Sequence, residues 1–371
     1  MKKLHRKKNV LTGMIVKMTA LGLGVALVLI TAPTLAGKLS NLTALSAGIS
    51  FWDGSIGLPT EEEITVTENK IDDLPINHDA GLLTMPDDPE PSEEPDTEET
   101  SAQTSEEEPP KKPDDAGKII RKTFEGAGVN LGTGYLKNQT SLSTKEIQKL
   151  AKADLPFELT DTDEPQVLIY HTHATESYMP YLCDWFDPSW KSRSTNDDKN
   201  MTAVGDVLQK KLEDAGIGVI HDKEHYDASY TGAYDRSRVM IEKYLKQYPS
   251  IKVVLDVHRD AIGNDPITAP ATTIEGKPTA QVMIISCAGT KSKKIPNYKK
   301  NLTFAAQLQN QMEKDYPTLT RPILFSNRHY NQDLSTGALL IEVGSHGNTL
   351  NEAKNAIGFV GDSLIHLLKG Q

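Results

Sequence analysis

The chain has 371 residues, 25% of them charged, and a net charge of −11, which suits one or two globular domains accompanied by polar segments. Its acidic balance argues against a nucleic-acid partner, because nothing in the sequence concentrates Lys and Arg on one face. The two cysteines, Cys183 and Cys287, could pair with each other but are too few for a disulfide framework.

Residues 1–40 predict a cytoplasmic basic tail and a transmembrane anchor. The stretch MKKLHRKKN precedes an apolar run over residues 10–36 that only Lys17 interrupts. About 20 apolar residues cross the ~30 Å hydrocarbon layer, and the basic flank predicts an N-terminus that stays in the cytoplasm. A cleaved signal peptide is the alternative, because residues 34–36 form a loose small-residue cleavage pattern. Under both interpretations the chain after residue 40 lies outside the cytoplasm.

Two segments separate the anchor from the folded part of the chain. Residues 41–85 are interpreted as a membrane-proximal stalk. Residues 86–115 hold most of the acidic excess, contain many prolines and lack aromatic residues. Such a composition buries too little apolar surface to offset the entropy of ordering. We therefore predict a disordered acidic linker at 86–115 and a globular catalytic domain at 116–371.

Apolar periodicity within residues 116–371 predicts alternating helices and strands. Helices are expected at residues 143–153 (with Ser143 or Thr144 as N-cap), 200–216, 233–249, 298–316 and 348–370 (with Asn348 as cap). Strands are expected at 166–170, 217–222, 251–258, 338–344 and, after a Pro-rich loop, 280–288. The strands are near-continuous runs of Val, Ile and Leu, which indicates a sheet covered on both faces. The predicted fold is a single α/β domain whose central sheet is mixed and mostly parallel.

Three of these strands end in residues that can carry chemistry. The run VLIY ends at His171 within HTHATE, VVLD ends near His258 within DVHRDA, and LLIE ends at Glu342. In open α/β sheets, ligands bind beyond the carboxyl ends of the strands. The three motifs therefore converge if their strands are neighbours. Each motif on its own has a bland alternative, since His-x-His occurs by chance and a single histidine at a strand end is usually a surface group.

The residue types predict a zinc site. Catalytic zinc is commonly bound by two His and one carboxylate, with a fourth position open. His258 supplies one ligand, Glu176 is the candidate carboxylate, and either His171 or His173 supplies the other imidazole while its neighbour contacts substrate. Glu342 is the candidate general base.

Neighbouring polar residues have supporting roles in this interpretation. Asp256 is the expected hydrogen-bond partner of a ligand histidine, a role that Asp260 could share. Arg259 either holds a substrate carboxylate with its planar guanidinium or forms a structural ion pair. His221 and His225 are interpreted as loop residues. The polar loop at residues 325–337, FSNRHYNQDLSTG, is a candidate for substrate contact.

The motifs VLIYHTHATESY, DVHRDA and RHYNQDLSTGALLIEVGSHGNTLNEA, together with the anchor and acidic linker, resemble the stage II sporulation protein P family. The resemblance covers residues 116–371. It implies a zinc-dependent N-acetylmuramoyl-L-alanine amidase that acts on peptidoglycan, with a possible endopeptidase activity on cross-links. It also implies sporulation proteins D and M of stage II as partners, in septal thinning and engulfment. The expected location is the mother-cell membrane at the sporulation septum, with the catalytic domain outside the cytoplasm.

The resemblance also assigns roles by position. His173 takes the place of the amidase histidine at the end of the first strand, His258 that of the middle histidine, and Glu342 that of the catalytic glutamate. The amidase carboxylate ligand lies further downstream, where this chain offers Asp197 and Asp198. We assign the role to Glu176, because HTHATE stands where the wider family has a glycine-rich motif.

His171 and Arg259 are the remaining catalytic candidates. The resemblance implies that one of them steadies the oxyanion or a peptide carboxylate. Two other classes of function stay open at this stage. The first is another zinc metallopeptidase or amidohydrolase, and the second is a non-catalytic wall-binding protein.

Overall fold

The computed structural model describes residues 109–370. The predicted anchor, the predicted stalk and residues 86–108 of the predicted linker lie outside this part of the chain. Within residues 109–370, no helix combines the length and the apolar character that a membrane span requires.

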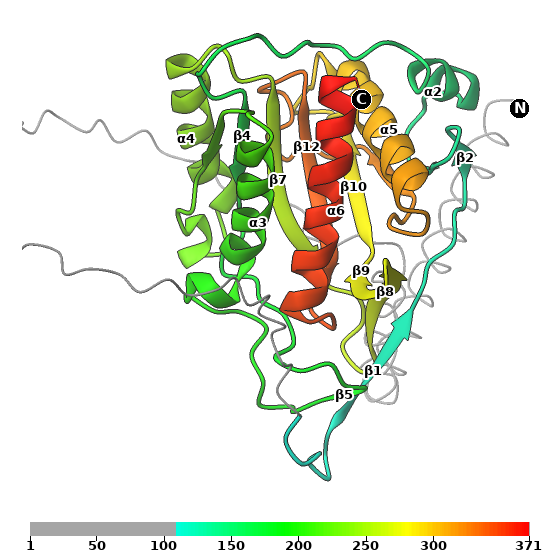
Figure 1. Ribbon diagram of the computed structural model, residues 1–371, viewed down its shortest axis with the longest axis vertical. Helices are drawn as coiled ribbons and strands as arrows, with labels where there is room; N and C mark the ends of the chain where they lie inside the picture. The colour runs from blue at the N-terminus through cyan, green and yellow to red at the C-terminus, as the bar shows by residue number, and fades with distance from the viewer. Residues whose placement is uncertain (1–108, 371) are drawn as a thin grey trace, which may run out of the picture.

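An eight-stranded mixed sheet forms the centre of the fold, in the order β2-β3-β11-β10-β12-β7-β4-β6 (Figure 1). Its strands are β2 (Val129–Asn130), β3 (Tyr135–Asn138), β4 (Val167–Tyr170), β6 (Val219–His221), β7 (Val253–Asp260), β10 (Val282–Cys287), β11 (Ile323–Ser326) and β12 (Ala338–Ser345). The β2–β3 and β10–β12 pairs are antiparallel, and the other neighbours run parallel. The prediction of a mixed, mostly parallel sheet is confirmed.

Helices cover both faces of this sheet, as the near-continuous apolar strands indicated. One face packs against α3 (Met201–Asp214), α5 (Tyr298–Asp315) and α6 (Leu350–Lys369), which lie in front of the sheet in Figure 1. The short helix α2 (Thr144–Leu150) contributes Ile147 to the same core. The opposite face packs against α4 (Ala233–Gln247), where Ile241 meets Leu168 and Val254. Successive strand residues point to opposite faces, so each strand feeds both cores.

A second, four-stranded sheet in the order β5-β1-β8-β9 lies at one end of the central sheet (Figure 1). Its strands are β1 (Gly117–Lys122), β5 (Trp185–Phe186), β8 (Ile267–Ile274) and β9 (Lys277–Ala280). The prediction of a Pro-rich loop before residue 280 is wrong, because this stretch holds β8 and β9. β8 pairs in parallel with β1, Ile119 lying opposite Ile267, so this sheet depends on partners far apart along the chain.

The helix starts follow capping chemistry. Ser143 accepts a hydrogen bond from the Glu146 amide and caps α2, as predicted. Helix α6 begins with a reciprocal capping box between Thr349 and Glu352. The prediction of Asn348 as this cap was off by one residue, because the Asn348 side chain accepts from the Ser345 amide instead.

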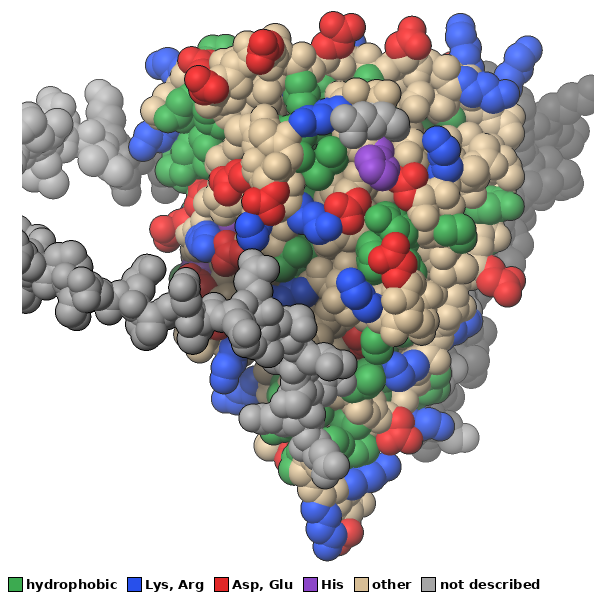
Figure 2. Space-filling view, in the orientation of Figure 1, with side chains coloured by type: hydrophobic (Ala, Val, Ile, Leu, Met, Phe, Trp, Pro, Cys, Tyr) green, Lys and Arg blue, Asp and Glu red, His purple; other side chains and the backbone are tan. Residues whose placement is uncertain are grey.

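Two short 3-10 helices, η1 (Asp197–Lys199) and η2 (Tyr226–Ala228), complete the elements. The two cysteines do not pair, and Cys287 is buried in the core. On the face shown in Figure 2, Lys and Arg side chains are interspersed with Asp and Glu.

Candidate metal centre

The strands that carry the three predicted motifs are neighbours. Parallel β4 and β7 pair with Tyr170 opposite Asp256, and parallel β7 and β12 pair with His258 opposite Glu342. Paired residues on adjacent strands project to the same face of a sheet. His258 and Glu342 therefore stand side by side on the face that α4 covers.

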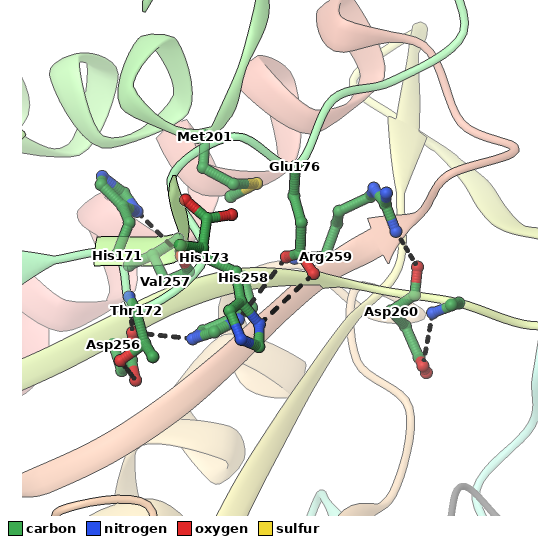
Figure 3. A network of polar contacts seen from close by, with 12 residues as sticks. His171, Thr172, His173, Glu176, Met201, Asp256, Val257, His258, Arg259 and Asp260 are labelled. Atoms are coloured by element: carbon green, nitrogen blue, oxygen red, sulfur yellow. Dashed lines mark hydrogen bonds and ion pairs between the residues drawn. The ribbon is translucent and has the colours of Figure 1, made fainter. Parts of the chain in front are cut away.

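Three residues meet at these strand ends in a cluster that could hold a metal ion. Ligand atoms of His173, Glu176 and His258 all lie within 4.8 Å of one another. His173 Nδ1 is 3.6 Å from Glu176 Oε1, and His258 Nδ1 is 3.5 Å from Glu176 Oε2. Figure 3 shows the Glu176 carboxylate directed toward the His258 ring.

These separations fit zinc. Ligands ~2.1 Å from a tetrahedral ion lie about 3.4 Å from one another. The two separations run to different oxygens of Glu176 and are both close to that value, and two His with one carboxylate are the ligand types of a catalytic zinc site. The residues predicted as metal ligands are therefore brought together in a fitting arrangement, while Asp197 is engaged elsewhere, 2.7 Å from His225 Nε2.

A turn after β4 explains why two of these residues face each other. The Glu176 amide donates to the His173 carbonyl, which places side chains three positions apart on one side. The carboxylate is then held by the Arg259 amide, which donates to Oε2 over 3.3 Å. The Arg193 guanidinium approaches Oε1 to 3.7 Å from the other side.

His258 has an outer carboxylate partner, as predicted. Its Nε2 lies 2.7 Å from Asp256 Oδ1, which leaves Nδ1 facing Glu176. Asp256 is fully buried and accepts from both the amide and the hydroxyl of Thr172. A carboxylate behind a ligand imidazole sets the orientation of its ring and strengthens it as a ligand.

The charges of the cluster suit a cation. Burial opposes ionisation of Glu176, but its hydrogen bond with His258 and the charge of Arg259 outweigh this and hold the pKa of the carboxyl well below its usual range. Burial also opposes protonation of His258, yet Asp256 and Glu176 raise the pKa of its imidazole well above the ordinary value. Burial, and then the His258 charge, lower the pKa of His173 to about 4. A metal ion held by His258 Nδ1 would replace the proton that this nitrogen otherwise directs toward Glu176, while Nε2 keeps its contact with Asp256.

Glu342 lies beside the cluster, opposite His258, and one of its carboxylate oxygens is available to a substrate or water. Its Oε2 is buried and has no hydrogen-bond partner among the described residues. Burial, and then the negative charge of Asp260, raise the pKa of Glu342 to about 8. A carboxyl group with this pKa can take up and return a proton near neutral pH.

His171, a predicted catalytic residue, is not brought to the cluster. Its Nδ1 lies 2.8 Å from the Val257 carbonyl and its Nε2 lies 2.8 Å from His221 Nε2. The residue is fully buried, and Figure 3 shows its ring directed away from Glu176. Both nitrogens are therefore used inside the protein, and we correct the expectation that His171 contacts substrate.

Arg259 does not present its guanidinium to a substrate either. Nε donates to the Ser177 carbonyl, and the terminal nitrogens donate to the carbonyls of Ser192 and Asp260. Arg259 thus fastens the loop that carries Glu176, which corrects both roles expected for it. Asp260 pairs with Arg321 over 2.9 Å and is not a partner of a ligand histidine.

Sequence reasoning missed an aromatic wall around the cluster. The Tyr230 ring stacks on His173 with centroids 4.7 Å apart, and the Tyr234 ring lies parallel to His258 at 6.5 Å. The aromatic run HYDASYTGAYD at residues 225–235 is the only signal for them in the sequence, and such runs are equally common in cores. His221 is the last residue of β6, as the predicted strand at 217–222 implied, and not a residue of the loop that follows.

Comparisons with known proteins give a family. The family model described as stage II sporulation protein P matches residues 64–364. Stage II sporulation protein P of Bacillus subtilis (strain 168) is 35% identical over 224 residues, which cover 57% of this chain and 53% of that protein. The match thus spans about half the length of this curated relative.

Solved structures give weaker likenesses. The N-acetylmuramoyl-L-alanine amidase AmiC2 of Nostoc punctiforme is 10% identical, with a TM-score of 0.34, over 57% of this chain and 98% of its own. The CwlD amidase from Clostridioides difficile, in complex with the GerS lipoprotein, gives a TM-score of 0.35 at 10% identity over 56% and 100%. Because the family model matches most of the sequence, this chain belongs to the stage II sporulation protein P family.

Proposed function

We propose that this protein is a zinc-dependent hydrolase that cleaves the amide bond between N-acetylmuramic acid and L-alanine in peptidoglycan during sporulation. The observation that carries the proposal is the His173–Glu176–His258 cluster with the Glu342 carboxyl beside it on the next strand. Membership of a sporulation family supports the setting. The choice of the muramoyl amide follows the expectation drawn from the sequence resemblance.

The zinc ligands in this proposal are His173 Nδ1, His258 Nδ1 and the Glu176 carboxylate. Zinc held by such a set polarises a carbonyl group and lets water act as a nucleophile near neutral pH. Glu342 Oε2 accepts the proton of the attacking water and returns it to the leaving amine. Asp256 keeps the His258 ring oriented, and the stacked Tyr230 ring shields one side of His173 from solvent.

The cellular setting is part of the same proposal. Residues 10–36 would anchor the chain in the mother-cell membrane, and residues 86–115 would carry the domain toward the septal wall. The proteins D and M of stage II sporulation are the expected partners. In this proposal the same site also cleaves peptide cross-links, as an endopeptidase.

Two measurements test the proposal. The first is zinc content per chain for the wild type, His173→Ala and the matched control His225→Ala, whose histidine contacts Asp197 outside the cluster. We expect one zinc in the wild type and the control, and loss in His173→Ala. The second is product analysis on defined muropeptides.

The products decide between the candidate functions. Free stem peptide and intact glycan support an amidase, whereas cut cross-links with intact muramoyl amides indicate a metallopeptidase. Binding to cell wall with no bond broken, by protein that contains zinc, would refute the catalytic assignment.

A further inference from the structure

A chain of buried polar groups connects the β11–β12 loop, residues 327–337, to the metal-site residue His258. Asn331 Nδ2 donates to Ser237 Oγ over 3.2 Å, and Ser237 Oγ lies 3.1 Å from Thr172 Oγ1. Thr172 Oγ1 donates to Asp256 Oδ2 over 2.8 Å, and Asp256 Oδ1 lies 2.7 Å from His258 Nε2. Ser237, Thr172 and Asp256 are fully buried, so solvent does not compete for these contacts.

The donors and acceptors at the two ends of this series of contacts set the direction of every hydrogen bond between them. The Asp256 carboxylate only accepts hydrogen bonds and the Asn331 amide nitrogen only donates them. The Thr172 hydroxyl proton goes to Asp256, so its oxygen can only accept from Ser237. Ser237 in turn accepts from Asn331. Within residues 109–370, the competing acceptor for the Ser237 proton is the Tyr234 carbonyl, at 3.2 Å.

The backbone around Asn331, the first residue of this series of polar contacts, has an unusual conformation. Tyr330 and Asn331 have φ values of 45° and 54°, in the left-handed region. Asparagine tolerates this region better than tyrosine, and such strain persists only where the surroundings enforce it. Here the Gln332 side chain accepts from the Cys287 amide and donates to the Ile285 carbonyl, which holds the loop against β10.

An aromatic column runs alongside this chain of polar contacts, whose last step, from Asp256 to His258, is an ion-pair contact. The Tyr330 ring stacks on Tyr234 with centroids 5.1 Å apart, and Tyr234 lies over His258. Asn331 Nδ2 also donates to the Tyr234 carbonyl over 2.8 Å, which joins the loop to the first turn of α4. The strained loop therefore reaches the same imidazole by two routes.

We propose that Thr172, Ser237 and Asn331 are positioning residues that act through Asp256 to hold His258 in its metal-binding orientation. This inference rests on the proposed function, because it takes zinc as the ion of the cluster. It makes the β11–β12 loop, which lies beyond direct contact with the metal ligands, a determinant of zinc affinity. The hydroxyl groups of Thr172 and Ser237 and the amide group of Asn331 then act on the ion together, although none of them touches it.

Zinc affinity of the full chain, measured by competition with a chelating dye, tests the proposal. Thr172→Val keeps the side-chain shape and removes the hydroxyl, and we expect about a tenfold loss of affinity, the lower end of the effect of losing an outer partner. Thr172→Ser restores the hydroxyl and should bind zinc like the wild type. Thr303→Val is the matched control, because its buried hydroxyl donates to Lys299 in α5, outside this chain of contacts.

A double-mutant cycle separates a connected chain from independent packing effects. Ser237→Ala should weaken zinc binding less than Thr172→Val, and the double variant should bind like Thr172→Val alone, because Ser237 acts only through Thr172. Asn331→Gly removes the amide while it keeps the backbone conformation accessible, and it should weaken binding in the same direction.

The stability of the metal-free variants, measured in parallel, distinguishes positioning from packing. An unchanged zinc affinity in Thr172→Val, with a loss of stability like that of Thr303→Val, would overturn the inference and leave the proposed function standing. Additive losses in the double variant would also overturn it. A wild type that binds no zinc would overturn both. If Thr172→Val does not fold, Ser237→Ala carries the test, because it leaves the Thr172–Asp256 contacts in place.

Discussion

Replacing Glu342 with glutamine isolates the predicted proton transfer from metal binding. Glutamine matches the size of the side chain but cannot accept and return a proton. Glu342 is paired with His258 across β12 and β7 and is not one of the three clustered ligands. We therefore expect Glu342→Gln to keep one zinc per chain and to lose turnover.

The size of the loss follows from the position of Glu342 Oε2. This oxygen is buried, lacks a hydrogen-bond partner within residues 109–370 and belongs to a carboxyl group whose pKa is raised to about 8. A positioned general base with a pKa near the working pH contributes roughly 10²–10⁴-fold to a rate. That range corresponds to about 3–5 kcal/mol of activation free energy. Because Glu342 Oε2 is buried beside the cluster and has no other hydrogen-bond partner within residues 109–370, we expect a loss of about 10³-fold.

The assay compares single-turnover release of stem peptide by zinc-loaded wild type, Glu342→Gln and Glu313→Gln. Glu313 is a matched control in α5, where its carboxylate accepts from the amides of Thr318 and Thr320. Zinc content is measured on the same samples. Turnover of Glu342→Gln within about tenfold of wild type, with zinc bound, would refute the assignment of Glu342 as the base.

The raised pKa of Glu342 predicts that the stability of the metal-free protein depends on pH, and the Glu342→Gln variant provides the comparison. The pKa of Glu342 rises from 4.5 to about 8 on folding, so the native state favours the protonated carboxyl. Its contribution to stability is full below pH 4.5 and is lost as pH rises through 8. Denaturant unfolding should therefore show wild type losing stability relative to Glu342→Gln across this range. A difference that does not change with pH would contradict the burial argument.

Three further predictions concern the residues around the cluster. Apparent zinc affinity should increase with pH, because the raised pKa of His258 makes zinc compete with a proton. Calorimetry in buffers of different ionisation enthalpy should detect the released proton. Zinc binding without proton release would place the ion elsewhere. His171→Phe should retain one zinc per chain. Its unfolding free energy should fall by about 1–3 kcal/mol, because the buried Val257 carbonyl loses its hydrogen-bond donor. Loss of zinc from this variant would make His171 a ligand. Gly205→Ala should lower the unfolding free energy by about 1–3 kcal/mol, because the new Cβ would lie 2.4 Å from His221 Nε2 and 2.6 Å from His171 Nε2; an unchanged melting temperature would show that α3 can shift to make room.

Secondary structure was predictable where apolar residues recur in a regular pattern. The strands now called β4, β7, β10 and β12, and the helices α3 to α6, agree with the predicted ranges to within a few residues. The strands β2, β3 and β11 of the central sheet were missed, and so were β1, β5, β8 and β9 of the second sheet. The order of the second sheet depends on pairings such as Ile119 with Ile267, and no local pattern in either segment shows that the other will be its neighbour.

The grouping of His173, Glu176 and His258 was within reach of sequence reasoning, because parallel neighbouring strands deliver their ends to one edge of the sheet. The orientation of single side chains was not. His171 and His173 are two residues apart, yet one binds the Val257 carbonyl and His221 while the other joins the cluster. The backbone after β4 turns instead of continuing as a strand, so the alternation of an extended chain does not apply.

The sequence by itself determined the class of fold, the mostly parallel central sheet and the three strand ends where chemistry gathers, because apolar periodicity acts locally and the alternation of strands with helices follows general rules of chain topology. Only the tertiary structure showed that the three strands are neighbours. Only the tertiary structure decided that Arg259 fastens the Glu176 loop, that tyrosines wall the cluster and that Asn331 reaches toward Asp256. Those outcomes depend on buried hydrogen-bond partners supplied by distant segments. A buried polar group takes whichever partner the completed fold places within reach.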